Sequence, residues 1–439
     1  GLVGSEMCIR DSLHGGSNLS CNRTPPNFEY AVWIDYRRRA PDVFFNRAQI
    51  VQGIANWIGP EVMLSTQPRG EHPGSNNASI VSGGSNVYVV WDEWVGVDYV
   101  HLIYFNRSLN NGASFLAQAI NLDNTQQEAG YNPAISCSGN NVCVAWEVLI
   151  DNTHSDIYVN YSTNSGNPGT WRSNAIPVRT GRWATHPHIA QTGTFVYLVW
   201  MEAAPGGSTS DIYFSRSTNS GQNWSSPTRL DFNDPPGANI SYAPKVCCAG
   251  NGRVYVTWGD MRVNGVENPY FAYSSNFGFT WQGDFRLNTG RAAGANRDYY
   301  PHIACEGNYV AVVYESDRNQ LNGPEDIYMN CSTDGGVTWL TPDVRLDLGD
   351  PPAASHSCHP RVSVWDYGFG IHPQVYFYAA WMDDRNAAPF TGWDIYGTFG
   401  TFDPTAVPQW QWWPDYRIDV GDQPGANGCL LYTSDAADE

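Results

Sequence analysis

A short apolar run that ends in an aromatic residue recurs along the chain at a nearly constant period. Consecutive copies are 54 to 67 residues apart, and the seven copies end at Trp33, Trp91, Trp146, Trp200, Trp258, Tyr314 and Trp381. A fixed period of this length indicates a protein built from repeated structural units. The repeat limits the fold more strongly than the length of 439 residues, which alone would suggest about three domains.

Each repeat has the same internal order. A segment that often contains proline comes first, and the apolar run follows it after a Gly/Asn turn. A third run opens with an acidic residue, as at Asp156, Asp211 and Asp326, and a fourth run follows a tight turn. Four short strands per repeat are typical of a β-propeller blade. We therefore expect an all-β fold, a β-propeller of four-stranded antiparallel blades, with seven blades and with six or eight as alternatives.

A turn motif of the form S-x-[DN]-x-G, followed by an aromatic residue, lies between the third and fourth runs. Four copies begin at Ser108, Ser217, Ser274 and Ser332, and a fifth begins at Ser162 with two extra residues before its aromatic residue. The Asn or Asp side chain can bond nearby backbone amides, and the glycine can adopt a positive φ. We expect the aromatic residue to pack against its own blade.

These five motifs resemble the Asp-box, or BNR, repeat of the sialidase superfamily. The resemblance covers nearly all of the chain between its two ends. It implies a sialidase-like propeller in which the box lies on the face opposite the ligand site. The loops between the second and third strands, and the linkers between blades, would then share the ligand-binding face. One architecture hosts many activities, so the motif predicts fold more strongly than function.

The two ends match no repeat. Residues 1–12 and 429–439 resemble translated adapter sequence from assembled environmental data, so we expect foreign segments there and a single propeller domain over residues 13–428. The segment from Ser17 to Cys21 resembles a short first strand. Cys137 and Cys143 flank a tight turn, where a cross-strand disulfide and two small buried strand residues are the alternatives.

The composition is acidic, with a formal net charge of −19. Phosphate binding requires clustered Lys and Arg, so nucleic acid is not an expected partner. No apolar run reaches the roughly 18 residues of a membrane span, so membrane insertion is not expected either. The sequence favours a secreted or cell-surface protein. It does not indicate an oligomeric state.

Candidate ligand-binding residues lie in linkers whose sequences occur only once. They are Arg182, Trp183, His186, His188, Arg297, Tyr299, Tyr300, His302 and Arg361. Aromatic rings beside Arg and His suit the recognition of sugars or carboxylates. The alternative is that a Tyr or His before each proline packs the linker against the channel mouth, as the Tyr residues before Pro133 and Pro244 suggest.

Carboxylates recur in the loops that follow the apolar runs, often with an arginine nearby. A single active site needs residues that differ between blades, so structural ion pairs are favoured, for instance Arg318 with Asp326. A separate Asp-x-x-Asp pattern ends several repeats. Its members could hold calcium weakly, although ordinary turn chemistry is favoured: Asp231, Asp234, Asp347 and Asp350. No other metal and no organic cofactor is expected.

The sequence thus predicts a propeller that binds a glycan or an extracellular protein on its loop face without catalysis. One alternative is an exo-acting glycoside hydrolase of sialidase type, and another is a structural surface or adhesion module. The resemblance implies an arginine triad, a tyrosine nucleophile paired with a glutamate, and an aspartate acid/base. No residue falls in a matching catalytic motif, so no catalytic residue is assigned. Three arginines converging beside a Tyr–Glu pair would favour the hydrolase.

Overall fold

A computed structural model describes most of the chain between residues 17 and 417. The described ranges are 17–22, 28–35, 41–51, 54–65, 74–95, 100–123, 129–151, 154–204, 207–288, 292, 294–367, 374–386, 394–403 and 410–417. Regular secondary structure in these ranges is β-strand throughout, which confirms the all-β prediction for them. In the same ranges the structure contains no helix suited to crossing a membrane.

The chain divides into two compact units, and the described residues of the first lie within 17–202 and 214–228. Its first three groups of strands are antiparallel. The first group is β1 (Ser17–Asn22), β2 (Phe28–Asp35), β3 (Asp42–Val51), β4 (Ile54–Trp57) and β5 (Val62–Met63). The second is β6 (Ser75–Gly83), β7 (Asn86–Val95), β8 (Val100–Ser108) and β9 (Ile120–Asn121). The third is β10 (Ala129–Ser138), β11 (Asn141–Asp151), β12 (His154–Ser162) and β13 (Ile176–Arg179).

A fourth group follows, and the division between the units falls within it. It consists of β14 (Trp183–Thr192), β15 (Phe195–Ala203), β16 (Ser210–Ser217) and β17 (Thr228–Arg229). One parallel pair, Ser155 opposite Trp183, joins β12 to β14, so β10 to β17 form a single eight-stranded sheet. The predicted strand from Ser17 to Cys21 is present as β1, which pairs with β2.

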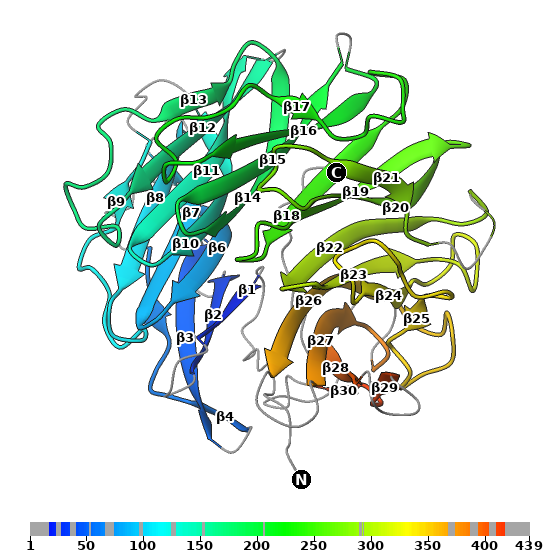
Figure 1. Cartoon of the computed structure of the whole chain (residues 1–439). Helices are drawn as coiled ribbons and strands as arrows, with labels where there is room; N and C mark the ends of the chain where they lie inside the picture. The colour runs from blue at the N-terminus through cyan, green and yellow to red at the C-terminus, as the bar shows by residue number, and fades with distance from the viewer. Residues whose placement is uncertain are drawn as a thin grey trace. The chain divides into compact units, whose positions relative to one another are not determined.

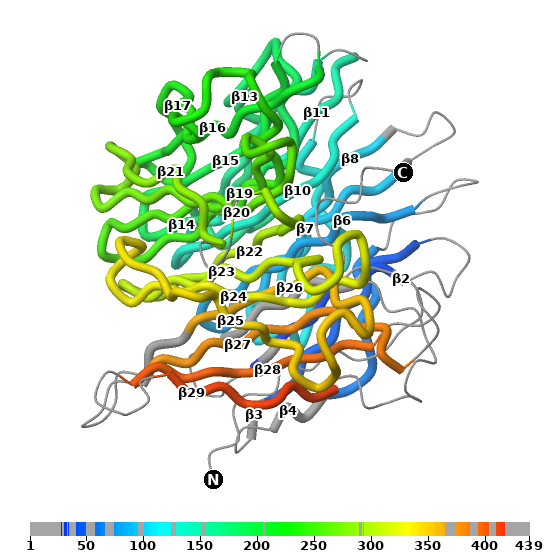
Figure 2. The backbone as a smooth tube through the Cα atoms, turned by 90° about the vertical axis from the view of Figure 1, so that its right-hand side faces the viewer, coloured from blue at the N-terminus to red at the C-terminus, as the bar shows by residue number. Residues whose placement is uncertain are grey.

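The second unit contains residues 203–213 and 229–428, and three sheets follow one another in it. They are β18 (Ser241–Cys248), β19 (Val254–Val263), β20 (Val266–Ser274) and β21 (Gln282–Arg286); β22 (Asp298–Glu306), β23 (Tyr309–Ser316), β24 (Asp326–Ser332) and β25 (Val344–Arg345); and β26 (Ser357–Tyr367), β27 (Gln374–Asp383), β28 (Asp394–Phe402), β29 (Trp410–Trp412) and β30 (Tyr416–Arg417). The first strand of each sheet contacts the first strand of the next, β18 with β22 and β22 with β26. Figure 1 shows this succession from green to red, and Figure 2 shows it from the side.

The recurring aromatic residues occupy equivalent places, as predicted. Each lies on the second strand of its group. Trp146, Trp258 and Trp381 are fully buried, and each stands opposite a tyrosine of the third strand. Val, Ile and Tyr around them alternate between the two faces of a sheet, and both faces are covered, which explains the nearly continuous apolar runs. These strands form the core of every group.

The S-x-[DN]-x-G turn is closed by its own side chains. In the copy at Ser332, the hydroxyl donates to Asp334 Oδ1 at 2.8 Å and accepts the amide of Gly336 at 2.9 Å. Asp334 Oδ1 in turn accepts the amide of Thr338 at 2.9 Å. The copies at Ser108 and Ser274 repeat this pattern. The turn is therefore stabilised by hydrogen bonds among its own residues, as its sequence predicts.

The aromatic residue of the turn packs against residues of its own sheet, as expected, and also against the preceding sheet, which the sequence did not predict. Trp339, which follows β24, meets Phe271 of β20 edge to face with ring centroids 4.7 Å apart. Trp171 meets Phe105 of β8 in the same way. The turn glycine explains the direction, because a Cβ on Gly336 would lie 2.6 Å from the Phe271 ring. Because glycine has no side chain, the Phe271 ring can approach the turn closely. Trp339 then packs over the Phe271 ring.

The proposed disulfide between Cys137 and Cys143 does not form. Cys137 stands opposite Val142, and Cys143 stands opposite Ser136. An offset of one residue places the two side chains on opposite faces of the sheet. Both cysteines are free, and the Cys143 thiol donates to the carbonyl of Ser220 at 3.7 Å. The alternative, small strand residues packed inside, describes them correctly.

Candidate functional site

One residue in the first strand of each of six successive groups has a positive φ, and in five of these strands it lies in a β-bulge. The six residues are Asn77 (φ 48°), Asn132 (49°), His186 (55°), Ala243 (49°), Tyr300 (48°) and His359 (55°), and all but His186 lie in a bulge that the strand register shows. Five of the six precede a proline, a position that ordinarily favours an extended backbone. A bulge re-aims one side chain, and strained non-glycine residues concentrate at functional sites. The bulges therefore mark where a ligand site is to be sought.

In the second unit, two bulges place aromatic rings side by side. Tyr300 on β22 and His359 on β26 stack with ring centroids 6.1 Å apart and planes at 14°. Tyr242, on β18, meets Tyr300 edge to face at 6.3 Å. All three side chains are partly exposed. We call Tyr242, Tyr300, His359 and the polar residues around them, described below, the bulge cluster.

An arginine borders these rings. Arg297 donates from Nε to Glu267 Oε2 at 2.8 Å, and its guanidinium lies 4.8 Å from the centroid of the Tyr299 ring. The hydrogen bond to Glu267 raises the pKa of Arg297, so the guanidinium stays charged. With 43% of its side chain exposed, Arg297 can still receive a ligand.

A tyrosine and a glutamate form a hydrogen-bonded pair beneath the rings. The Tyr299 hydroxyl donates to Glu325 Oε1 at 2.6 Å, and Glu325 Oε2 lies 2.6 Å from His356 Nδ1. Tyr299 is only 7% exposed, and burial raises its pKa well above the ordinary range. A neutral, covered hydroxyl positions Glu325 and His356 but has little access to a ligand.

Glu315 lies deeper still, at 3% exposure. Its Oε1 accepts the backbone amide of His359 at 2.7 Å, which holds the β26 bulge in place. Burial, together with the neighbouring charge of Glu325, raises the pKa of Glu315 to about 8. The carboxyl is therefore mostly protonated at neutral pH, which lowers the negative charge of the bulge cluster.

The remaining candidates of the second unit lie close to these residues. His302 and Arg361 each follow a bulge by two positions and are partly exposed. Arg361 donates from Nη1 to the carbonyl of Pro360 at 3.0 Å, and its charge acts on Glu315. The structure thus brings Arg297, Tyr299, Tyr300 and Arg361 together around Glu315.

The other four candidates belong to the first unit, at or beside the start of β14. Arg182 is 49% exposed at its side chain, with Nε 3.6 Å from Glu202 Oε1. Trp183 and His188 are partly exposed. His186 has a positive φ, and its amide donates to Glu147 Oε2 at 2.8 Å. Glu147 therefore holds the backbone at His186 as Glu315 holds the β26 bulge at His359.

Sequence reasoning recognised the linker that holds His356 and His359, but it did not place several residues of the bulge cluster among its candidates: Tyr242, Glu267, Glu315 and Glu325. One signal was available, because each central residue of a bulge directly precedes a proline in most repeats. Glu315 follows the recurring Tyr314, and the residue at this position is acidic in only three of the seven repeats. Its place beneath the bulge cluster depends on pairing between strands, which the sequence does not show.

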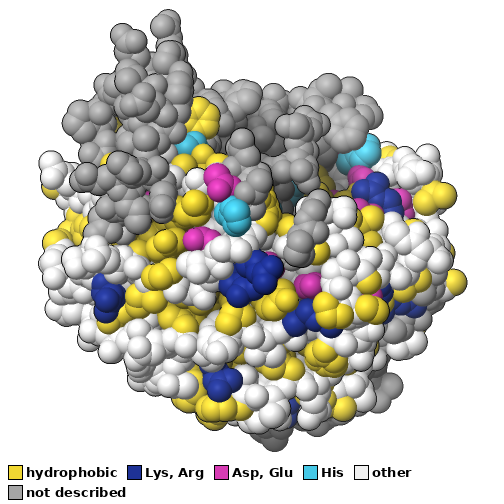
Figure 3. All heavy atoms as spheres, turned by 90° about the horizontal axis from the view of Figure 1, so that it is seen from above, with side chains coloured by type: hydrophobic (Ala, Val, Ile, Leu, Met, Phe, Trp, Pro, Cys, Tyr) yellow, Lys and Arg dark blue, Asp and Glu magenta, His cyan; other side chains and the backbone are white. Residues whose placement is uncertain are grey.

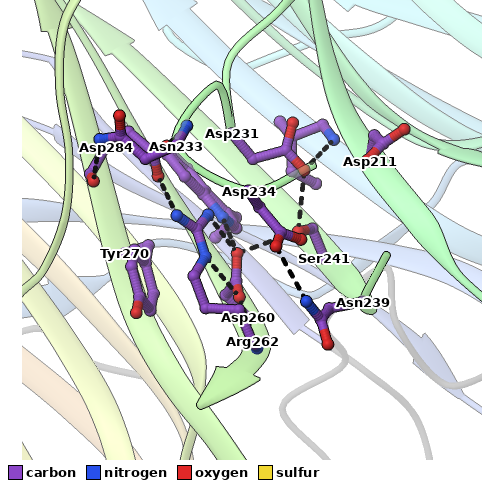
Figure 4. Close-up of polar contacts among 12 residues, drawn as sticks. Asp211, Asp231, Asn233, Asp234, Asn239, Ser241, Asp260, Arg262, Tyr270 and Asp284 are labelled. Atoms are coloured by element: carbon purple, nitrogen blue, oxygen red, sulfur yellow. Dashed lines mark hydrogen bonds and ion pairs between the residues drawn. The ribbon is translucent and has the colours of Figure 1, made fainter. Parts of the chain in front are cut away.

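The repeated carboxylates and arginines are mainly structural, as expected. Figure 4 shows Arg262 beside Asp260, with Asp284 near it and the Tyr270 ring beneath its guanidinium. Arg262 reaches Asp260 at 2.6 Å and Asp284 at 2.8 Å, and it lies 4.1 Å from the Tyr270 ring centroid. Asp260 also accepts the indole N–H of Trp258 at 3.0 Å. The Asp260 carboxylate is therefore engaged in structural contacts.

The pair proposed for Arg318 was wrong in its partner. Arg318 contacts Asp343 at 2.8 Å and Asp298 at 3.4 Å, whereas Asp326 contacts Arg345 at 2.8 Å. Arg318 lies over the Tyr328 ring, 3.5 Å from its centroid, and this directs its guanidinium towards the fourth strand. Ion pairs between arginines and aspartates thus occur as expected, but Arg318 pairs with different aspartates from the one predicted.

The Asp-x-x-Asp pattern forms turns held by arginine. Asp231 accepts the Ser241 hydroxyl at 3.0 Å and lies 3.3 Å from Arg229, and Asp234 accepts Asn239 Nδ2 at 2.8 Å (Figure 4 shows both aspartates). Burial and the charge of Asp211 raise the pKa of Asp231 to about 7. The second copy behaves similarly, with Arg345 on Asp347 and Asp350. Among the described residues, no group of three His, Cys, Asp or Glu side chains could hold a metal ion.

Comparisons with known proteins identify the fold but not a family. No family model matches the chain, and no curated protein matches it. Two solved structures of a polysaccharide lyase, PL25 ulvan lyase, have a TM-score of 0.51 at 11% identity. One of them is bound to -[GlcA(1-4)Rha3S]-; the match covers 87% of this chain and 92% of that chain. For the other structure the shares are 86% and 91%.

A Hadza microbial sialidase is also similar, at a TM-score of 0.40 and 12% identity. That match covers 69% of this chain, which spans 63% of the length of the sialidase. The likeness to the ulvan lyase structures concerns the fold alone, and the described strands of this chain form antiparallel sheets consistent with a β-propeller.

Proposed function

We propose that this protein binds a glycan at the bulge cluster without cleaving it. The observation that carries the proposal is the parallel pair of Tyr300 and His359, held on two bulges with positive φ. Sugar rings present apolar faces that pack on aromatic rings, while their hydroxyls need polar partners at the edge. The backbone strain at these two residues is the kind of cost that persists at functional sites.

An acidic sugar would fit the polar edge best. Arg297 and Arg361 can bind a carboxylate, since guanidinium groups match carboxylates in a bidentate geometry. The proton on Glu315 removes one negative charge from their surroundings near neutral pH. The ulvan lyases, whose fold is similar, act on a polysaccharide that contains a uronic acid. We therefore expect uronate-containing glycans to bind more tightly than neutral ones.

Trp183, with Arg182, His186 and His188, is proposed as a further glycan contact on the first unit.

The face drawn in Figure 3 carries only scattered Lys and Arg side chains, many of them near Asp or Glu. No broad basic patch is visible on the described residues of that face, which supports a glycan over nucleic acid. We also propose that the seven groups of strands are blades of one secreted or cell-surface Asp-box propeller.

The runner-up is an exo-acting glycoside hydrolase of sialidase type. The hydrogen bond between Tyr299 and Glu325 favours it, because that type of hydrolase pairs a tyrosine with a glutamate. The burial of Tyr299 speaks against it, because a nucleophile must reach the substrate. Hydrolysis of a fluorogenic sialoside that is abolished by Tyr299→Phe would replace the binding proposal with this one.

The binding proposal is tested by a glycan array that includes uronate-containing and neutral oligosaccharides. Replacing Tyr300 by Ala removes one ring of the stack, and losing such an anchor typically costs about 2 kcal/mol, or roughly 30-fold in Kd. Trp183→Ala tests the contact on the first unit in the same array. Binding that is unchanged in Tyr300→Ala would contradict the site.

The matched control is Tyr273→Ala. Tyr273 is partly exposed and lies at the end of β20, whereas Glu267, which binds Arg297, lies at its start. Six residues of strand separate them, or about 20 Å. Tyr273→Ala should therefore leave glycan binding unchanged, and an equal loss in both variants would indicate a general effect on folding.

A further inference from the structure

Two cysteines of the second unit lie on neighbouring sheets and point into the same core. Cys247 is near the end of β18, and Cys305 is near the end of β22. These first strands contact each other. Both side chains pack against the buried cluster that contains Tyr255, Phe271 and Ile303.

The structure shows Cys247 and Cys305 as thiols on contacting strands that face one buried cluster. Burial raises the pKa of Cys247, and an interaction with the Cys305 side chain offsets part of that rise, which agrees with the two thiols lying close together. The neighbouring Cys248 stands next to Cys247 on the same strand, and consecutive strand residues point to opposite faces. Cys331 belongs to a different buried cluster, which also contains Met329 and Trp381. Cys305 is therefore the expected partner of Cys247.

We propose that Cys247 and Cys305 form a disulfide that joins β18 to β22 in the mature protein. The reaction is exchange with a small disulfide such as oxidised glutathione. One cysteine thiolate attacks it and releases one glutathione thiol, and the second cysteine then displaces the other. Two protein thiols are oxidised to one disulfide, and one glutathione disulfide is reduced to two thiols.

The timing of this reaction follows from burial. Burial raises the pKa of the Cys247 thiol, and only the thiolate reacts. Exchange in the folded protein would therefore be slow, so the bond is expected to form as the chain folds. Once formed, it closes the chain from β18 to β22 and joins the strands that carry Tyr242 and Tyr300.

The test is oxidative refolding of the full chain in a mixture of oxidised and reduced glutathione. Free thiols are then blocked with N-ethylmaleimide in denaturant, and the protein is digested without reduction. Mass spectrometry should find the peptides of Cys247 and Cys305 linked, with a mass lower by two hydrogens than their sum. Reduction should separate them and lower the thermal midpoint by roughly 5 °C, as expected for a loop of this length.

Cys247→Ser is the test variant, and Cys248→Ser is its matched control on the opposite face of the same strand. The linked peptides and the response to reduction should disappear in Cys247→Ser and persist in Cys248→Ser. Two blocked, unlinked thiols at positions 247 and 305 would overturn the proposal. So would a link between Cys248 and Cys305. Since no glycan is involved, these results are independent of the proposed function.

Discussion

Single residues beneath the bulge cluster set its charge. Glu315 is almost fully covered, yet its carboxyl holds the amide of His359 rather than an arginine. Glu147 does the same for His186 in the first unit, and burial raises its pKa too. Acidic residues one position further along, such as Asp260, instead accept an indole N–H and an arginine. Neighbouring carboxylates thus have different roles, depending on which face of the strand they occupy.

The pKa of Glu315 predicts how stability depends on pH. The folded state keeps a proton up to about pH 8, whereas the unfolded chain loses it near pH 4.5. Between these values the folded state binds more protons, so this carboxyl makes the free energy of unfolding decrease as pH rises. Glu315→Gln should reduce that slope in urea unfolding curves and should be more stable than the wild type at pH 9 by about 2 kcal/mol.

Glu306→Gln serves as the control, since Glu306 is a partly exposed glutamate at the end of β22. Its unfolding curves should follow those of the wild type across the same range. A Glu315→Gln variant with an unchanged slope would show that another buried carboxyl, such as Asp231, governs the dependence.

At the scale of elements, local patterns predict well and pairing between sheets does not. The four strands of each repeat and the S-x-[DN]-x-G turn follow from apolar alternation and turn chemistry, which act within a few residues. Trp339 also shows the limit, because only the assembled sheets reveal that it covers Phe271. The Tyr300–His359 stack depends on two bulges in different strands, and a bulge is a property of the register between strands. Arg297 and Arg361 were among the candidates, but the carboxylates beneath them were not.

The turn glycine provides a test at this scale. In Gly336→Ala the methyl group would meet the Phe271 ring at 2.6 Å while the backbone keeps a φ of 85°. Strain and overpacking together should lower the free energy of unfolding by about 3 kcal/mol. Gly307→Ala is the matched control, since Gly307 has a φ of 58° and no atom near the added methyl group. It should cost only about 1 kcal/mol, and equal losses would show that the contact with Phe271 is unimportant.

At the scale of the whole molecule, the net charge of −19 opposes folding through mutual repulsion. Several arginines are largely covered in ion pairs, such as Arg262 and Arg385, and salt screens partly buried pairs far less than exposed charges. Raising NaCl from about 10 to about 300 mM shortens the Debye length from roughly 30 to below 10 Å. The thermal midpoint at pH 7.5 should therefore rise by a few degrees, as measured by differential scanning calorimetry.

Near pH 4.8, where the chain carries no net charge, the same addition of salt should have little effect. A midpoint that falls with salt at pH 7.5 would mean that exposed ion pairs outweigh the repulsion.

The repeated bulge also bears on how such a protein can diverge. Six strands offer the same backbone geometry, and the residues that occupy it range from Ala243 to Tyr300. Side chains at these positions can therefore be exchanged while the strands beneath keep their pairing. During evolution, recognition residues could then be substituted one position at a time without changes to the residues that stabilise the strands. The strands would then keep their structure while the residues at these six positions vary. Related chains should therefore differ most at these six positions.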